Sequence, residues 1–220
     1  MKSYQQYCAV AKALDVVGDR WALLIVRELL AFGPSRYIDL ERGLPGIASN
    51  LLVARLKSME ADGLIERRLA APPIGAKVYE LTPRGRALDS VLRALAGWGV
   101  PAMSEGPAEA DAVQPQWSAV FAGLTLTPAP REDRPVVIGL ETGNTSVRAV
   151  LHGDGSFHVA RGLEGDVDVS MSGSALLIGG VLSGQLSPTE ATRLGLVVTG
   201  RAELLEQLTA AASTRTEVAS

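Results

Sequence analysis

The sequence predicts a two-domain α+β protein, with a helical first half that carries one hairpin and a second half of short strands and helices. Helical spacing of apolar residues dominates up to about residue 100, and short strand-like runs dominate after about residue 135. Residues 101–115 between them collect prolines, small residues and acids, which is typical of a linker. We therefore expect domains at 1–100 and 116–212, followed by a frayed tail at 213–220.

The composition is that of a globular protein. The 220 residues are 47% hydrophobic and 20% charged, which is too apolar for a disordered chain. No apolar run approaches the length of a membrane span, and the first ten residues lack the pattern of an export signal. A single cysteine excludes an internal disulfide framework. We expect a cytoplasmic protein with no membrane partner.

The charge is divided unequally between the two halves. Residues 1–100 hold 14 Lys/Arg against 10 Asp/Glu, and residues 101–220 hold 7 against 14. A basic half joined to an acidic half favours a first domain that faces a polyanion.

The elements of the first half follow from apolar spacing and from stop signals. Four helices are predicted, at about 10–17, 21–32, 36–44 and 49–61, ending at Gly18, Gly33-Pro34, Pro45-Gly46 and Asp62-Gly63. Ser35 is predicted to cap the third helix. Two strands at 64–70 and 77–82 flank the turn stretch 71–76, and Thr82-Pro83 starts a last helix that runs to about Trp98.

The helix at 49–61 has two different faces. Leu52, Leu56 and Met59 fall on the inner face, and the outer face is formed by Asn50, Val53, Ala54 and Lys57. Small side chains let a backbone approach base edges, their methyl groups suit thymine, and an asparagine pairs with adenine. The alternative is an ordinary amphipathic helix with a solvated face.

Basic side chains surround this helix in the sequence. Arg55 and Lys57 are predicted to bind phosphate or, for Arg55, guanine. The predicted hairpin adds more cations beside the helix, and the start of the third helix completes the candidate DNA-binding set: Ser35, Arg36, Arg67, Arg68 and Lys77. A helix–turn–helix followed by a basic hairpin and a closing helix is more specific for DNA binding than any single element.

Several separated motifs appear in order: CAVAKALDVVGDRWALLIVRELL (8–30), LPGIASNLL (44–52), EADGLIERR (60–68) and YELTPRGRAL (79–88). Over about residues 5–100 the chain thereby resembles the HxlR family of winged helix–turn–helix transcriptional regulators. The resemblance implies a homodimer formed through the first and last helices of this half. It also implies that the 49–61 helix reads double-stranded DNA, with the hairpin as wing, on a pseudo-palindromic operator.

The chain departs from the family at the start of the 49–61 helix. Members often have Ser-Pro where this chain has Ala48-Ser49, so Ser49 either caps the helix or bonds to a phosphate. Val53 occupies a place where a polar residue is common, so the operator sequence does not carry over.

Cys8 lies at the family's position for a thiol, which in some members senses oxidants or electrophiles. A reactive thiol needs positive charge and access to solvent, and Lys12, one turn on, is a candidate source of charge. The alternative is a quiet, buried cysteine that acts as a small hydrophobe.

The second half resembles the sterol carrier protein type 2 fold over about residues 114–212. The strand-like runs are 136–142, 146–153, 156–162, 167–173 and 194–200, and the motifs are DVSMSGSALLI (168–178), LSGQLSPTEA (182–191) and GLVVTGRAELL (195–205). We expect a mainly antiparallel sheet, with a meander of strands first and helices later. Ser187-Pro188-Thr189-Glu190 predicts a capping box.

Members of that second family bind lipids or acyl chains in an apolar tunnel. The candidate pocket residues here are Trp117, Phe121, Leu140, Leu177, Val181 and Leu182. The same residues are equally what a closed core requires.

Other chemistry finds no support in the sequence. His152 and His158 have no carboxylate or cysteine partner at metal-like spacing, and no nucleophile elbow or phosphate loop appears. We expect no catalytic site, metal or cofactor. We predict a DNA-binding transcriptional repressor whose second domain binds a small apolar effector or aids assembly. The rival is a lipid-binding carrier whose winged helix docks a protein.

Overall fold

The computed structural model describes residues 3–71, 75–103, 106–126 and 134–217, with side chains described as far as residue 210. The chain divides into two compact units, Met1–Ser90 and Val91–Ser220. Residues 72–74 of the predicted turn, 104–105 of the predicted linker and 218–220 of the predicted tail lie outside the described residues.

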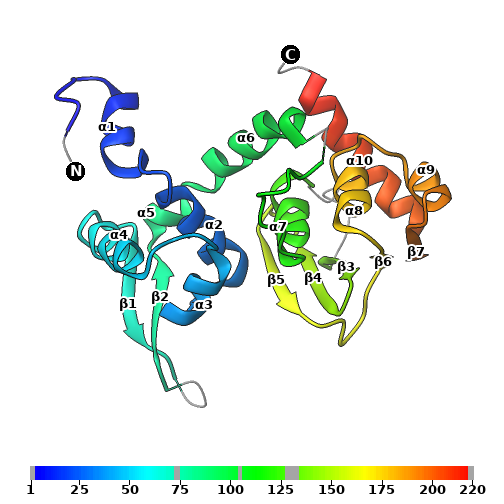
Figure 1. The fold of residues 1–220 in the computed structure, drawn as a ribbon, viewed down its shortest axis with the longest axis horizontal. Coiled ribbons are helices and arrows are strands. Elements are labelled where there is room, and N and C mark those ends of the chain that lie inside the picture. The colour runs from blue at the N-terminus through cyan, green and yellow to red at the C-terminus, as the bar shows by residue number, and fades with distance from the viewer. Residues whose placement is uncertain (1–2, 72–74, 104–105, 127–133, 218–220) are drawn as a thin grey trace. The chain divides into compact units, whose positions relative to one another are not determined.

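The first unit has the predicted order of four helices, a hairpin and a further helix (Figure 1). Its elements are α1 (Ala9–Val17), α2 (Ala22–Phe32), α3 (Tyr37–Gly43), α4 (Ser49–Ala61), β1 (Ile65–Leu69), β2 (Lys77–Leu81) and α5 (Pro83–Arg86). The two strands pair antiparallel, with Ile65 opposite Leu81. This is a winged helix–turn–helix domain.

Local signals set most of these boundaries. Gly63 has a φ of 68°, a left-handed conformation that ends α4 without a Cβ penalty. The Thr82 hydroxyl accepts a hydrogen bond from the Gly85 N–H at 3.2 Å, with Pro83 at the first helical position. The predicted helix stop and the predicted cap are therefore both confirmed.

Ser35 does not cap α3 as predicted, because tertiary pairing holds it in an extended conformation. Its N–H donates to the Tyr79 carbonyl at 2.9 Å, and its carbonyl accepts from the Tyr79 N–H at 2.8 Å, so Ser35 forms a β-bridge to β2. The residue at the cap position is Arg36, whose backbone N–H is accepted by Asp39 at 3.3 Å. The helix therefore starts one residue later than its sequence signal indicates.

The helix predicted over 83–98 is also corrected, since it divides into α5 and α6 (Asp89–Gly99). The chain turns at Ala87-Leu88, where the Leu88 N–H bonds to the Gly85 carbonyl three residues back at 3.1 Å. A bond to the third residue back tightens the turn and interrupts the regular α-helical ladder.

The core of the first unit lies between the helices and the base of the hairpin. Its largest fully buried side chains are Ile25, Leu29, Leu40, Leu44, Leu52, Leu56, Met59 and Ile65. Burying one such side chain stabilises the fold by about 1.5–3 kcal/mol.

The second unit contains a five-stranded sheet in the order β5-β4-β3-β6-β7, in which only the β3–β6 pair is parallel. Besides most of α6, its elements are η1 (Val100–Met103), α7 (Gln116–Thr125), β3 (Val136–Thr142), β4 (Thr145–Leu151), β5 (Phe157–Arg161), β6 (Val169–Ser172), α8 (Ala175–Leu182), α9 (Pro188–Arg193), β7 (Val197–Gly200) and α10 (Ala202–Glu217). A helix, α7, precedes the first strand, so the predicted order of strands first and helices later is wrong. The predicted capping box at Ser187 and Glu190 is confirmed.

Helices cover one face of this sheet, with α7 packed on β4 and β5 and beside α8 (Figure 1). The sheet residues under the helices include Ile138, Leu140, Ala149, Leu151 and Met171, all fully buried. On β4 and β6 the buried residues alternate with exposed or half-buried ones. On the other face, Leu163 and Val167 lie over Gly139. None of the helices in the described ranges combines the length and apolar character that a membrane span requires.

Arg93 ties α6 to the rest of the second unit. Its Nη1 donates to the carbonyls of Gly123 and Leu124 at 2.9 and 3.1 Å, at the C-terminal end of α7. Its Nη2 donates to the Gly155 carbonyl at 2.6 Å, and the guanidinium lies 5.6 Å from the Phe157 ring centre. A cation at a helix C-terminus stabilises the last carbonyls, so Arg93 fixes α6 against α7 and the β4–β5 hairpin.

Candidate nucleic-acid interface

Helix α4 divides into the two faces that its sequence spacing predicts. Leu52, Leu56 and Met59 are buried, and the helix lies beside β1. The opposite face, formed by Asn50, Val53, Ala54 and Lys57, is exposed along its length. The exposed face therefore carries one amide, two small apolar side chains and one cation, which together leave the backbone accessible.

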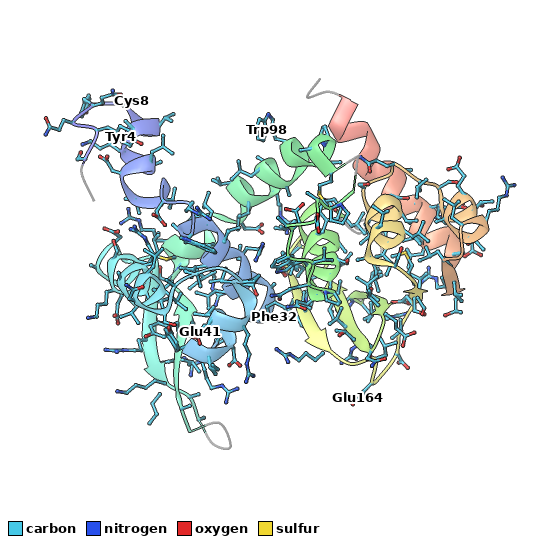
Figure 2. The ribbon with its side chains drawn as sticks, in the orientation of Figure 1. Tyr4, Cys8, Phe32, Glu41, Trp98 and Glu164 are labelled. Atoms are coloured by element: carbon cyan, nitrogen blue, oxygen red, sulfur yellow. The ribbon has the colours of Figure 1, made fainter. Side chains whose placement is uncertain are left out.

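The start of α4 is held by its neighbour α3 and not by a cap of its own. Ala48 occupies the cap position, and Ser49 is already helical, which makes the predicted cap at Ser49 wrong. The Ser49 hydroxyl donates to Glu41 at 2.7 Å, and the Tyr37 hydroxyl donates to Glu41 at 3.1 Å (Figure 2 labels Glu41). The Ser49 hydroxyl, which the sequence indicates as a possible phosphate contact, thus donates its hydrogen bond to Glu41 instead.

Arg55 is only partly available to a nucleic acid. Its Nη2 lies 2.9 Å from the Asp19 carboxylate, and its side chain is 23% exposed. Asp19 also accepts a hydrogen bond from the Trp21 N–H at 3.0 Å, just before α2. The sequence indicates Arg55 as a phosphate or guanine contact but not its pairing with Asp19, because Asp19 lies 36 residues earlier in the chain.

The wing carries its cations on two different faces. In the β1–β2 register Arg67 stands opposite Tyr79 and Leu69 opposite Lys77, so Arg67, Leu69 and Lys77 share one face. All three are exposed, and Leu69 is 70% exposed. Leu69 is not among the predicted site residues, although its alternation with Arg67 is visible in the sequence.

Arg68 lies on the opposite face of the wing and forms a close ion pair with Glu80. The hydrogen bond from Arg68 is the largest cause that holds the pKa of the Glu80 carboxyl below its usual value. The two adjacent arginines therefore differ. Arg67 is exposed on the same face as Lys77, whereas Arg68 forms an ion pair within the wing.

The remaining predicted contacts lie at the start of α3. Arg36 is exposed, and its guanidinium donates to Asp39 at 2.8 and 3.0 Å. Ser35 is 7% exposed, and its hydroxyl donates to the Gly33 carbonyl at 3.0 Å. The inward hydroxyl of Ser35 is a poor candidate for a DNA contact.

Cys8 is exposed at the cap position of α1, where Figure 2 shows it beside the N-terminal segment. The backbone N–H groups of Ala11 and Val10 lower the pKa of its thiol. Lys12 faces Asp15 instead, at 3.9 Å. The expected source of positive charge is thus corrected to the helix N-terminus, and the alternative of a buried thiol is wrong.

The candidate pocket residues of the second unit fall into two groups. Leu140, Val181 and Leu182 are fully buried. Trp117 and Phe121 on α7 and Leu177 on α8 are half-buried. Because α7 and α8 pack together, the three half-buried side chains lie on neighbouring helices.

A buried carboxylate in the second unit, Asp168, is not among the residues that the sequence indicates for a site. Asp168 has a side chain only 3% exposed, and it accepts from the Val137 N–H at 2.9 Å and from Arg134 at 3.1 Å. Arg201 lies 3.5 Å from the same carboxylate. Two arginines from distant segments therefore neutralise this charge at the end of the sheet.

Comparison with known proteins places the first half of the chain in a family. Residues 16–106 match the HxlR-like helix-turn-helix family. The uncharacterized HTH-type transcriptional regulators YvaP and YtcD of Bacillus subtilis (strain 168) are each 34% identical, over 87 residues (40% of this chain, 80% of YvaP) and 100 residues (45% of this chain, 78% of YtcD). The HTH-type transcriptional regulator YodB of the same organism is 31% identical over 86 residues, which cover 39% of this chain and 76% of YodB. The chain therefore belongs to the HxlR-like helix-turn-helix family, and a DNA-binding transcriptional regulator is the function that this membership supports.

Proposed function

We propose that the chain acts in the cytoplasm as a homodimeric repressor that binds a pseudo-palindromic operator in double-stranded DNA. Residues 1–100 bind DNA and dimerise, and residues 116–212 respond to an effector. The two α4 helices enter successive major grooves about 34 Å apart. The observation that carries the proposal is the slim, exposed face of α4, opposite a fully buried one.

The exposed face of α4 selects the DNA sequence. Asn50 offers an amide that pairs bidentately with adenine, and Val53 and Ala54 offer methyl groups to thymine. This set favours A·T pairs at the centre of each half-site.

Cations around α4 supply the affinity that does not depend on sequence. Lys57 on the helix and Arg67 and Lys77 on the wing bind phosphates. Leu69, between the two wing cations, packs against a deoxyribose or the wall of the groove. Arg36 joins this set by exchanging part of its contact with Asp39 for a phosphate.

Exposed apolar side chains support the homodimer. On α1, Val10 is 66% exposed and Leu14 is exposed beside it. On α6, Val91, Leu95 and Trp98 are exposed, and Figure 2 shows Trp98 pointing away from its helix. Clusters of exposed large apolar side chains indicate a protein interface. The family resemblance assigns these two helices to the dimer.

The second unit is proposed to bind a small apolar effector, in keeping with its resemblance to sterol carrier proteins. The half-buried Trp117, Phe121 and Leu177 on the packed helices α7 and α8 support this site. Cys8 is a second candidate input, because an exposed thiol with a lowered pKa reacts readily with electrophiles. Either event changes the spacing of the two α4 helices and releases the operator.

Selection of bound sequences from random duplexes tests this function. The expected result is a pseudo-palindrome with A·T-rich half-sites about 10–10.5 base pairs apart, bound by a species whose light-scattering mass is twice that of the chain. Failure to enrich any sequence contradicts the DNA-binding proposal. A lipid carrier with a docking winged helix predicts that failure, together with a rise in melting temperature on adding fatty acids or sterols.

A further inference from the structure

A tight hairpin tip joins β4 to β5 in the second unit. The His152 N–H donates to the Ser156 carbonyl at 2.9 Å, and the Gly155 N–H donates to the His152 carbonyl at 3.0 Å. Asp154 accepts from the Ser156 N–H at 2.9 Å and from its hydroxyl at 2.6 Å. On the inner side, Arg93 holds the Gly155 carbonyl. Five hydrogen bonds thus fix the conformation of the tip.

Two histidines meet on the outer side of this tip. His158 stands opposite Val150, and His152 lies two residues further along the same face, while Leu151 and Phe157 face the core. The distance from His152 Nε2 to His158 Nδ1 is 3.3 Å, the ring centres are 5.4 Å apart and the rings are tilted by 31°. The chain has only these two histidines, and the fold brings both to one point.

The nitrogen separation matches the bite of a metal ion. Two imidazole nitrogens bound tetrahedrally at about 2.0–2.1 Å from Zn²⁺ lie about 3.3–3.4 Å apart. A metal requires neutral imidazoles. In the ligand-free pair, the same separation is that of a hydrogen bond from one ring N–H to the bare nitrogen of the other ring. Metal binding requires the donor ring to adopt its other tautomer, in which the proton has moved through water to the outer ring nitrogen.

We propose that His152 and His158 form a two-imidazole binding site for a borderline divalent transition-metal cation such as Zn²⁺, Ni²⁺ or Cu²⁺. Imidazole suits these ions, whereas Mg²⁺ and Ca²⁺ prefer oxygen ligands. Within the part of the chain that the structure describes, no group of three or more His, Cys, Asp or Glu side chains is arranged to hold a metal. Water therefore completes the coordination shell, and the site exchanges its metal readily. This site does not depend on the proposed DNA-binding function.

A titration followed by NMR tests the site. The untagged full-length chain carries Cys8→Ser, so that the thiol does not bind metal, and the two sets of imidazole resonances are followed as Zn²⁺ is added at neutral pH. Both sets should shift together and saturate at one ion per chain, with Ni²⁺ and Cu²⁺ competing and Mg²⁺ without effect. His152→Gln and His158→Gln should each weaken binding by about tenfold or more, because a chelate loses one of its two linked ligands. Arg161→Gln, an exposed change on the same hairpin, should leave binding unchanged.

Several outcomes overturn the proposal. They are the absence of any shift at millimolar Zn²⁺, a shift of one imidazole alone, or binding that survives the double His152→Gln, His158→Gln change. The measurement on the chain with both histidines is decisive even where a variant folds poorly.

Discussion

Arg55 on α4 and Asp19 ahead of α2 form an ion pair, with 2.9 Å between Arg55 Nη2 and Asp19 Oδ2. Both side chains are more than three-quarters buried, and Asp19 also bonds to the backbone at the start of α2. The pair therefore connects the exposed helix to the loop before α2. It holds the orientation in which α4 presents Asn50, Val53 and Ala54.

Breaking this pair is expected to destabilise the first unit. Arg55→Ala and Asp19→Ala should each lower the free energy of unfolding by about 1.5–3 kcal/mol, the range for a hydrogen bond to a charged group. The double variant should cost clearly less than the sum, because the two changes remove one interaction. Denaturant titration measures this cycle, with the exposed Lys57→Ala as the control that leaves stability unchanged. Strictly additive losses would show that the pair contributes nothing.

The two wing arginines are expected to differ in their effect on DNA binding. Arg67→Ala should reduce the slope of log affinity against log salt by about 0.9, the value for one phosphate contact. Arg68→Ala should leave the slope unchanged, because its charge is paired with Glu80 on the other face. Fluorescence anisotropy over a range of salt concentrations measures both. Equal slopes for the two variants would mean that the DNA does not distinguish the two faces of the wing. That result would refute the assignment of the phosphate contact to Arg67.

Asp168 is expected to make the second unit sensitive to acid. Burial raises the pKa of its carboxyl, but the hydrogen bonds from Val137 and Arg134 and the charges of both arginines outweigh burial, so the folded pKa lies below the usual value. The resulting stability is present above the unfolded pKa of about 3.9 and is lost as pH falls through the lower folded value.

Asp168→Asn should therefore cost about 2 kcal/mol at neutral pH, and its deficit should shrink as the pH falls below about 4. Thermal unfolding between neutral and acidic pH measures the difference. The matched control is Asp166→Asn, since Asp166 is exposed two residues earlier. A deficit that stays constant down to low pH would mean that Asp168 acts through shape and not through charge.

Cys8 is expected to react with iodoacetamide at a lower pH than a free thiol, because backbone N–H groups of α1 lower its pKa. Val10→Pro removes one of these N–H donors at a position where a helix tolerates proline. The midpoint of the pH–rate profile should rise in this variant. Lys12→Ala should leave the midpoint where it is, since Lys12 is not among the causes of the shift. The opposite ranking of the two variants would restore Lys12 as the activating group.

Sequence reasoning succeeds where the signal is local. The limits of α4 at residues 49 and 61 agree with the prediction to the residue. Gly46 and Gly63, both with positive φ, lie just outside its two ends, and apolar spacing defines its buried face. The strand at 136–142 is equally well predicted, because three β-branched residues, Val136, Val137 and Ile138, open it and a turn follows Thr142.

Sequence reasoning fails where a distant partner decides the role of a residue. Serine is a residue type that often caps helices, yet the β-bridge of Ser35 to Tyr79 keeps Ser35 in an extended conformation. Arg68 looks equivalent to Arg67 until the hairpin register brings Glu80 beside it. The fold also brings Arg134 and Arg201 to Asp168, and no local pattern announces either contact.

A salt titration of the 220-residue chain with the DNA upstream of its own gene tests most directly whether α4 binds DNA. Log affinity is expected to fall linearly with log salt, and Lys57→Ala should reduce the slope by about 0.9. Asn50→Ala should leave the slope unchanged but lower the preference for that DNA over random duplex by about 1–3 kcal/mol. Binding that is absent, or that does not respond to salt, would contradict the central claim that the exposed face of α4 docks in a DNA groove.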